Sequence, residues 1–479
     1  MSPQRTVVWF RGKDLRIADH APLRDAAATG EVIPLFVLDP HFFAPERARP
    51  LAHRMQYLVD ALHDLAASLA ALGSRLVVVP GRSVDVVPAL AKRWRADRVV
   101  AQRWTAPIGR ARDAKVSAAL GRRFVLHDGE TLAPPGSVRS GSGTPYRVFT
   151  PFAKALRATV TIPRPWPAPT SLPAVPDDVA SDGVALPTCE TLGFARNDRV
   201  LRGGATAAGE RLHAFVRDGL GAYATHRDRM DLAGTSRLSA DLKFGALSPR
   251  RVWTAASDAG GGAGLQSFLN ELCWREFAHA TLWDHPELLE APFQPAWKGF
   301  PWRTDEAAWE AWVHGRTGYP VVDAAARQLL AEGHIHNRAR MVAASFLAKH
   351  LLLDFRRGED HWLRHLTDGD WAQNDAGWQW SAGCGCDAQP WFRVFNPVAQ
   401  GERFDPDGAY VKRWVPELAN VPSKWVHRPD EAPPLLLRSA GVRLGVDYPR
   451  PVVDHAMARA RFLATAKAHL GRGEGGDAG

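Results

Sequence analysis

One short stretch, residues 368–380, concentrates side chains that could hold a cofactor. It contains carboxylates, amides and indoles, at Asp368, Asp370, Trp371, Gln373, Asn374, Asp375, Trp378, Gln379 and Trp380. Each buried polar atom needs a hydrogen-bond partner, so a purely structural core would rarely use this mixture. The combination suits a site that binds a large, polar, redox-active aromatic group.

A second candidate site lies in Phe268–Phe277, which we expect to be helical. Helical spacing puts Glu271, Trp274 and Arg275 on one face. The apolar neighbours favour a raised pKa for Glu271, which could then donate a proton or a hydrogen bond. The alternative is a surface Glu–Arg pair beside a core tryptophan.

The turn Gly234–Ser239 offers backbone amides and three hydroxyls ahead of Lys243-Phe244-Gly245. Such a turn could cradle a phosphate at a helix N-terminus. On these residues alone, a serine-rich helix cap is the favoured interpretation.

Two other pairs resemble metal ligands only superficially. His334 and His336 are two residues apart and would not face each other on a helix, so we expect no metal pair there. Cys384 and Cys386 lack a second Cys or His pair in register, which predicts a loop with free thiols.

Composition indicates a globular protein with more than one domain. The 479 residues exceed one typical core, and no run approaches the roughly 18 apolar residues that span a membrane. A net charge of +9 favours a polyanionic partner such as nucleic acid, although an arginine-rich proteome would explain it equally. Four cysteines without a disulfide framework favour a reducing, cytoplasmic setting.

The elements that must position these groups differ between the two halves. Strands are predicted at 7–10, 32–38, 76–79 and 99–101, alternating with helices at 54–72 and 84–94. This alternation predicts a doubly wound parallel α/β sheet, and no G-x-G-x-x-G follows the first strand to place a dinucleotide there. After a Pro-rich connector at 163–187, helical periodicity dominates from about residue 203, at 210–218, 264–283, 321–331, 335–352 and 359–366.

Ordered motifs along nearly the whole chain resemble the photolyase/cryptochrome family, and within it the class I photolyases that repair cyclobutane pyrimidine dimers. The motifs are Trp9–Arg16, Ser140–Tyr146, Gly234–Ser239, Trp274–Phe277, Thr317–Ala325, His336–Arg338, Phe392–Pro397 and Gly445–Pro449.

The resemblance implies an α/β domain over residues 1–132 and a connector over 133–202. It also implies a helical FAD- and DNA-binding domain over 203–470, followed by a disordered tail over 471–479. The implied cofactor is FAD. The implied partner is UV-damaged DNA, bound by a monomer that needs no metal and no membrane.

The resemblance also implies which residues bind FAD. They are Tyr223, Thr235, Ser236, Arg237, Leu238, Ser239, Phe268, Glu271, Arg275, Asn337, Arg340, Asp368, Asp370 and Asn374. Arg340 would pair with Asp368, and Asp370 would lie near the ribose–isoalloxazine side. Asn374 would face flavin N5 with a neutral amide, whereas plant cryptochromes have a carboxylic acid there.

For the lesion, Trp274 and Trp380 match aromatics that pack on a flipped dimer. Glu271 matches an acid that hydrogen-bonds the dimer, and Asn337 and Met341 match residues that line its pocket. Asn374 completes the set implied for catalysis. Implied DNA contacts are Arg227, Glu271, Trp274, Asn337, Arg338, Trp380 and Gln400.

The chain departs from the family in its electron-supply tryptophans. Trp378 and Trp302 match the inner and outer members, but the middle position is Phe355. Phenylalanine is much harder to oxidise than tryptophan, so the usual route is interrupted. Trp362, about two helical turns after Phe355, is a hypothetical substitute, and the alternative is simple core packing.

Other departures concern His334 and the antenna chromophore. His334 stands where the family usually has a tryptophan, and a core or cap role is the favoured interpretation. Lys243 matches deazaflavin-binding members, but Trp104 replaces their aspartate, and Ile108-Gly109 replaces the folate-binding pair. Deazaflavin therefore stays open, whereas folate is not expected.

Two alternative functions belong to the same family. A cryptochrome-type blue-light receptor would normally rely on the interrupted tryptophan route. A (6-4) photolyase would need paired histidines where Asn337-Arg338 stands. Light-driven repair of cyclobutane dimers is the function that the residues favour.

Overall fold

The computed structural model describes residues 4–471. The chain forms two compact units: one comprises Met1–Gly221, Ser236–Pro286 and Thr367–Ala372, the other Ala222–Thr235, Glu287–Leu366 and Gln373–Gly479. Because each unit draws on several stretches, the expected linear boundaries after residues 132 and 202 stay a prediction. Apart from Gly471, the expected tail lies outside the described residues.

The first unit contains a five-stranded parallel sheet. The strands are β1 (Thr6–Phe10), β2 (Val32–Leu38), β3 (Val77–Pro80), β4 (Arg98–Gln102) and β5 (Phe124–His127). Their order is β3-β2-β1-β4-β5, and Val7 of the central strand pairs with Ile33 and Val99. The predicted doubly wound sheet is confirmed, although the sequence did not reveal β5.

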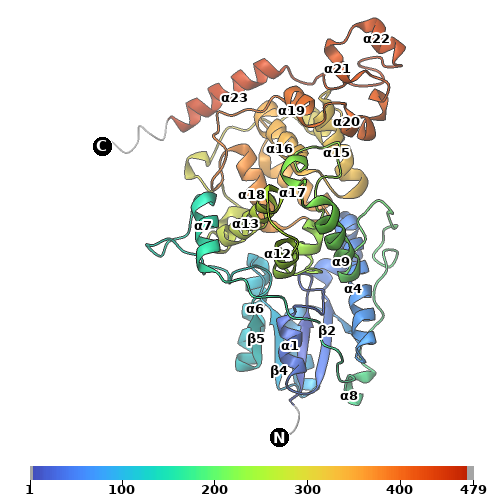
Figure 1. The fold of residues 1–479 in the computed structure, drawn as a ribbon, viewed down its shortest axis with the longest axis vertical. Helices are drawn as coiled ribbons and strands as arrows, with labels where there is room; N and C mark the ends of the chain where they lie inside the picture. Colours follow the sequence, from blue (N-terminus) through green and yellow to red (C-terminus); the bar gives the residue numbers. More distant parts are fainter. Residues whose placement is uncertain (1–3, 472–479) are drawn as a thin grey trace. The chain divides into compact units, whose positions relative to one another are not determined.

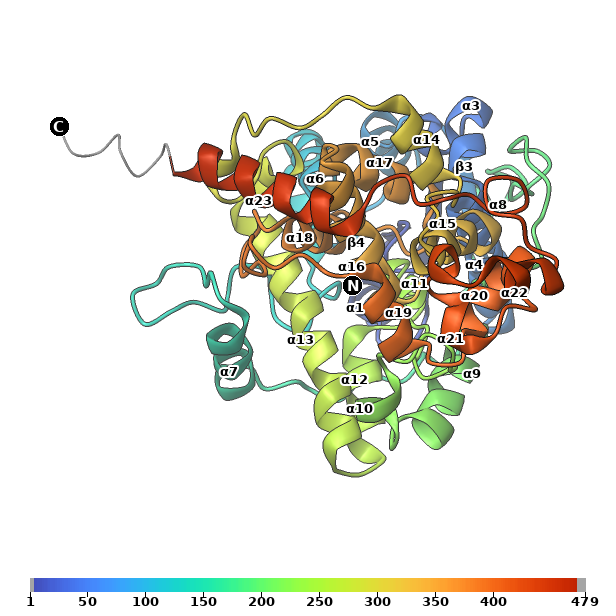
Figure 2. The same cartoon turned by 90° about the horizontal axis from the view of Figure 1, so that it is seen from above.

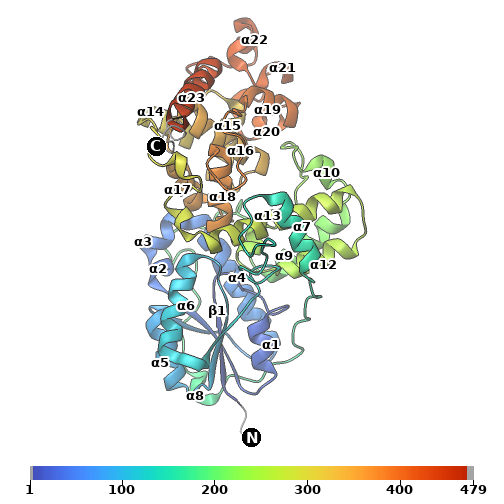
Figure 3. The ribbon, with the colours of Figure 1, turned by 90° about the vertical axis from the view of Figure 1, so that its left-hand side faces the viewer.

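Helices cover both faces of this sheet, with α5 (Ser83–Arg93) and α6 (Pro107–Leu120) opposite α1 (Ala21–Ala27) (Figure 3). Val8 and Phe10 point into one core with α1 and α4 (Ala52–Ala71). Val7 and Trp9 point into the other core with α5 and α6. The strands are apolar throughout because both of their faces are buried.

The same unit contains the helices nearest the candidate residues. They are α7 (Phe149–Thr159), α9 (Ala205–Ala214), α11 (Ser239–Lys243), α12 (Pro249–Asp258) and α13 (Ala263–Asp284). Helix α12 lies beside α13 (Figure 2). The expected connector at 163–187 holds only the short helix α8 (Asp177–Ala180). Shorter helices in this unit are α2 (Pro40–Phe43) and α3 (Pro45–Ala48).

The second unit is helical, as expected, and α15 (Pro320–Glu332) packs against α16 (Asn337–Ser345), α19 (Pro397–Phe404) and α20 (Ala409–Trp414) (Figure 1). Its other helices are α10 (Tyr223–His226), α14 (Glu306–Val313), α17 (Phe355–His365), α18 (Trp371–Ala382, whose first two residues belong to the first unit), α21 (Ser423–Val426), α22 (Pro434–Ser439) and α23 (His455–Leu470). Across residues 4–471, every helix is too short or too polar to cross a membrane.

Helix α16 begins two residues later than predicted. The ring of His336 accepts the Arg338 backbone N–H at 3.1 Å and so caps the helix. Gly333, with φ of 65°, ends the preceding helix in the left-handed region that glycine tolerates. The capping histidine is therefore His336, and the cap role that we considered for His334 is wrong.

Candidate functional site

Asn374 of α18 is held in one orientation by the backbone. Its side chain is mostly buried, and Nδ2 donates to the Glu359 carbonyl oxygen at 3.1 Å. This bond leaves Oδ1 as the atom available to accept from a ligand. An amide that is fixed in this way can hydrogen-bond a ligand without adding a charge to the site.

Two buried acids lie beside this amide: Asp375 follows it on α18, and Glu359 of α17 supplies the carbonyl that it contacts. Burial raises the pKa of Glu359, and the nearby Asp375 carboxyl raises it further. Burial also raises the pKa of Asp375, against the Gln379 amide that donates to it at 2.9 Å. Protonation of these acids lowers the negative charge around Asn374. The sequence did not reveal Glu359, because nothing in its neighbourhood marks it as buried.

Asp370 belongs to a buried ionic cluster in the first unit. The Lys13 ammonium donates to Asp370 Oδ2 at 2.7 Å and also to Glu130. Burial works against both charges, but the Lys13 ammonium holds the pKa of Asp370 well below its usual range. In turn, Asp370 and Glu130 hold the pKa of Lys13 above its usual value despite burial.

His279 completes this cluster as a neutral group. Burial and the Arg275 guanidinium lower its pKa to about 4, and Thr105 Oγ1 lies 2.7 Å from its Nδ1. Glu130, His279 and Asp370 have the spacing of a metal site. The Lys13 ammonium lies between the two carboxylates there. Its positive charge therefore offsets their negative charge, as a metal ion would.

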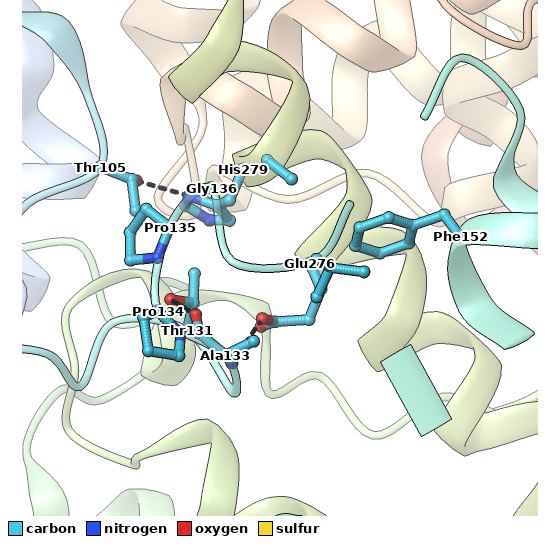
Figure 4. A pocket seen from close by; sticks show the side chains of 11 residues that line it. Thr105, Thr131, Ala133, Pro134, Pro135, Gly136, Phe152, Glu276 and His279 are labelled. Carbon is cyan, nitrogen blue, oxygen red and sulfur yellow. Dashed lines mark hydrogen bonds between the residues drawn. The ribbon is translucent and has the colours of Figure 1, made fainter. Parts of the chain in front are cut away.

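A small cavity of about 20 Å³ adjoins His279 and Glu276 of α13 (Figure 4). Glu276 accepts the Leu132 backbone N–H at 2.8 Å. Burial raises the pKa of Glu276 to about 7, against the neighbouring Arg275. The sequence predicts a raised pKa at Glu271, but Glu271 is only half-buried, and the fully buried glutamate of this helix is Glu276.

The indole of Trp274 has one face covered by another aromatic ring. The Phe149 ring stacks on it with centroids 3.7 Å apart and planes 6° apart. Both side chains are half-buried, and Glu271 precedes Trp274 by one turn on α13. The next residue, Arg275, is buried and donates to the Glu130 carbonyl at 2.8 Å. Phe149 follows the Ser140–Tyr146 motif but was missed, because its contact spans 125 positions of sequence.

Helix α16 puts two of its candidate residues on one face. Exposed Asn337 donates to Met341 Sδ at 3.8 Å, so both lie on one face. Arg338 forms an ion pair with Asp228 at 2.9 Å. Arg340 donates to the Ile335 carbonyl at 2.9 Å. Arg340 and Asp368 belong to different units, so their pairing stays a prediction.

The remaining side chains that we expect to contact the lesion or the DNA are only partly accessible. Trp380 is half-buried on α18. Arg227 lies 3.9 Å from Asp228. The buried Oε1 of Gln400 has no hydrogen-bond partner within the described part of the chain.

The hydroxyl-rich turn Gly234–Ser239 leads directly into α11. The N-cap position of that helix is Leu238, whose side chain caps nothing, so the serine-cap interpretation is wrong. Ser236 Oγ instead accepts the Leu238 backbone N–H at 3.4 Å within the turn. Arg237 has φ of 52°, a conformation that costs a non-glycine residue energy and often marks a functional turn.

Other expected cofactor residues lie in both units. Phe268 is buried in the first unit and packs against Phe215, with ring centroids 4.8 Å apart. Tyr223 is buried in the second unit.

The antenna candidates are crowded by protein atoms. Trp104 is buried, packs against Gly109 and lies under the Arg112 guanidinium at 4.3 Å. The Lys243 ammonium lies 3.3 Å from the centre of the Phe244 ring, and burial lowers its pKa well below the usual value. Both observations agree with an antenna site that is filled by side chains. The identity of a second chromophore stays a prediction.

The tryptophans expected to supply electrons lie in the second unit. Trp302 contacts the middle-position Phe355, with ring centroids 6.0 Å apart. Trp378 contacts Trp362, the hypothetical substitute, with ring centroids 4.5 Å apart. The four cysteines, including Cys384 and Cys386, are free thiols as predicted.

Family models match most of the chain. A model described as the FAD binding domain of DNA photolyase matches residues 268–468, and one described as DNA photolyase matches residues 6–172.

Full-length relatives agree with these models. Deoxyribodipyrimidine photo-lyase of Agrobacterium fabrum is 40% identical over 478 residues and covers 96% of each chain. A protein of the same name from Thermus thermophilus is 40% identical, over 98% of this chain and 99% of that one.

Solved structures show the same likeness. A bacterial class III photolyase from Agrobacterium tumefaciens superposes with a TM-score of 0.91 at 38% identity, over 98% of both chains. A Synechocystis cryptochrome has a TM-score of 0.87 at 30% identity, over 96% of this chain and 99% of that one.

Proposed function

Because this chain belongs to the DNA photolyase family, we propose that it uses blue light to split cyclobutane pyrimidine dimers in DNA. The observation that carries the proposal is Asn374, a buried neutral amide fixed by the Glu359 backbone. An amide can face a flavin in each redox state without placing a negative charge beside its reduced, anionic form. Plant cryptochromes, by contrast, have a carboxylic acid at this position.

The donor set fits FAD. Arg275 Nε is buried and has no hydrogen-bond partner among residues 4–471. A buried donor of this kind normally has a partner, so it favours a polar ligand. We assign the cofactor site to Tyr223, Thr235, Ser236, Arg237, Leu238, Ser239, Phe268, Glu271, Arg275, Asn337, Arg340, Asp368, Asp370 and Asn374. When bound, reduced and excited by light, FAD supplies one electron to the dimer and recovers it after the ring opens.

The side chains then bind and orient an extruded dimer. A dimer stacks and pairs poorly, so its extrusion costs less than that of normal bases; the photolyases are a known case of this principle. The open face of Trp274 would stack on the lesion, with Trp380 on its other side. Glu271 would donate a hydrogen bond to a dimer carbonyl, and Asn337 and Met341 would line the pocket.

Basic and amide side chains would hold the DNA backbone. Arg227, Arg338 and Gln400 are the proposed contacts, and Arg338 would exchange Asp228 for a phosphate. The net charge of +9 favours this association. We expect a monomer that acts in the cytoplasm on nucleoid DNA, with residues 1–132 as the antenna-type domain and 203–470 as the FAD- and DNA-binding domain.

The proposal is tested with purified holoprotein whose flavin has been chemically reduced. A dimer-containing oligonucleotide is added, and chromatography follows intact dimer in blue light and in darkness. We expect loss of the dimer only in light. Persistence of the dimer with fully reduced flavin would reject repair and favour the receptor function.

A further inference from the structure

Three histidine side chains gather in the second unit where helices α14 and α17 end. His361 and His365 lie one turn apart on α17, and their ring centroids are 4.7 Å apart. His314 is the C-cap residue of α14. We propose that His361, His365 and His314 bind one divalent transition-metal ion of the zinc or copper class. The proposal does not rest on DNA repair.

The two histidines of α17 already have the spacing of metal ligands. Residues four apart in sequence share one face of a helix. Metal–nitrogen bonds of about 2.0–2.1 Å bring the centroids of two imidazoles on one ion to roughly 5 Å from each other. His361 and His365 are separated by 4.7 Å, with ring planes inclined at 53°, so an ion between them requires little movement of either side chain.

Side-chain contacts between α14 and α17 explain why the three histidines share one end. Arg357 donates to Glu306 Oε1 at 2.9 Å near the start of both helices. One turn later, His361 contacts Trp309 with ring centroids 5.9 Å apart. The contacts therefore advance in the same direction along both helices. The next turn of each helix carries the other two histidines to the same end.

The charges at this end favour a cation. The C-terminal end of a helix carries a partial negative charge that stabilises a cation. His365 is the last residue of α17, and His314 follows the last residue of α14, so an ion between them meets both helix ends. The Glu310 carboxylate adds a full negative charge, with Oε2 3.2 Å from His314 Nε2. Arg364 opposes the ion, but it is exposed, so water and salt screen its charge.

The protonation of His361 suits a metal ligand. Only a neutral imidazole can bind a metal ion. Burial, and then the charges of His365, Arg364 and His314, lower the pKa of His361 to about 3. His361 is therefore neutral at neutral pH and has no proton to lose. Imidazole nitrogen suits zinc and copper, whereas calcium and magnesium prefer oxygen ligands.

A bound ion would join α17 to α14 close to the residue that orients Asn374. Glu359, whose carbonyl accepts Asn374 Nδ2, precedes His361 by two residues on α17. Side chains two residues apart point to different sides of a helix, so the ion would not contact the amide. Its role would be to hold the end of α17 in place.

Metal titration of the holoprotein tests the proposal, with any affinity tag removed and metal first stripped with EDTA. Calorimetry with Zn²⁺ gives affinity and stoichiometry, and electron paramagnetic resonance with Cu²⁺ reports coordinating nitrogens. We expect one ion per chain, bound by imidazole nitrogens. His365→Ala and His314→Ala should each weaken binding about tenfold or more. The control is His213→Ala, at an exposed histidine of α9, which should bind as the parent does. Parental affinity in either ligand variant, or an equal loss in His213→Ala, would overturn the proposal.

Thermal unfolding provides a second readout and checks that each variant folds without metal. An ion that binds only the folded site raises the unfolding midpoint as its concentration increases. Zn²⁺ should therefore raise the midpoint of the parent but not that of His365→Ala, and Mg²⁺ should raise neither. An equal rise in His365→Ala would place the ion elsewhere and overturn the proposal. Dimer splitting from chemically reduced flavin, measured in parallel, separates a failed metal site from a failed repair function.

Discussion

Phe149 stacks on Trp274 almost face to face, with planes 6° apart and centroids separated by 3.7 Å. The two residues come from different helices, α7 and α13, which pack together in the first unit. The stack fixes the indole plane and covers one of its faces. A flipped base can therefore stack only on the opposite face.

Phe149→Ala should weaken binding of dimer-containing DNA more than binding of undamaged DNA. An aromatic pair contributes about 0.5–1.5 kcal/mol, which corresponds at most to about a tenfold loss of affinity. Fluorescence anisotropy with both oligonucleotides measures the difference. Phe149→Tyr preserves the stack and is the control. Equal weakening for both DNAs would argue against a role in lesion recognition.

Lys13→Met should destabilise the first unit strongly. It leaves the buried carboxylates of Asp370 and Glu130 without their cation. Loss of one partner of a buried ion pair typically costs about 3–5 kcal/mol. Urea unfolding measures the change, and Arg164→Ala, at the exposed pair with Asp258, is the control that should change little. Near-parental stability of Lys13→Met would show that the cluster tolerates unpaired charge.

Glu276→Gln should flatten the dependence of stability on pH. The pKa of Glu276 is raised by burial from 4.5 to about 7, so the folded state favours the protonated acid. The parent holds this contribution fully below pH 4.5 and loses it as pH rises through about 7. The loss amounts to about 3 kcal/mol, which the neutral glutamine should escape. Unfolding free energies at about pH 5 and about pH 8 measure it. If the stability of the parent and of Glu276→Gln changed in parallel with pH, the raised pKa of Glu276 would be contradicted.

Asn374→Asp should reduce light-driven repair by chemically reduced holoprotein. The change removes the donor to the Glu359 carbonyl and introduces an acid beside the flavin. Leaving a buried acceptor unsatisfied costs about 1–3 kcal/mol, and a carboxylate would oppose an anionic flavin. The repair yield per absorbed photon checks this, with FAD content as the control. An undiminished yield would show that the amide is not required.

The parallel sheet was predictable because continuous apolar strands alternate with amphipathic helices. β5 escaped detection because it is only four residues long and follows the charged turn Gly121–Arg123. The start of α16 was misplaced because a histidine cap depends on a side-chain bond, not on periodicity.

The site was predictable only where its residues are close in sequence. Asn337 and Met341 share a face as spacing required. Lys13 was not connected to Asp370, because the pair lies 357 positions apart and lysine is a common surface residue.

Asn374 carries the central claim, because its fixed, neutral amide favours repair over the receptor alternative. One measurement tests that claim most directly: dimer splitting by the chemically reduced parent holoprotein, in blue light and in darkness. We predict that the dimer is lost in light and persists in darkness. Failure of the parent to split dimers from reduced flavin would contradict the account.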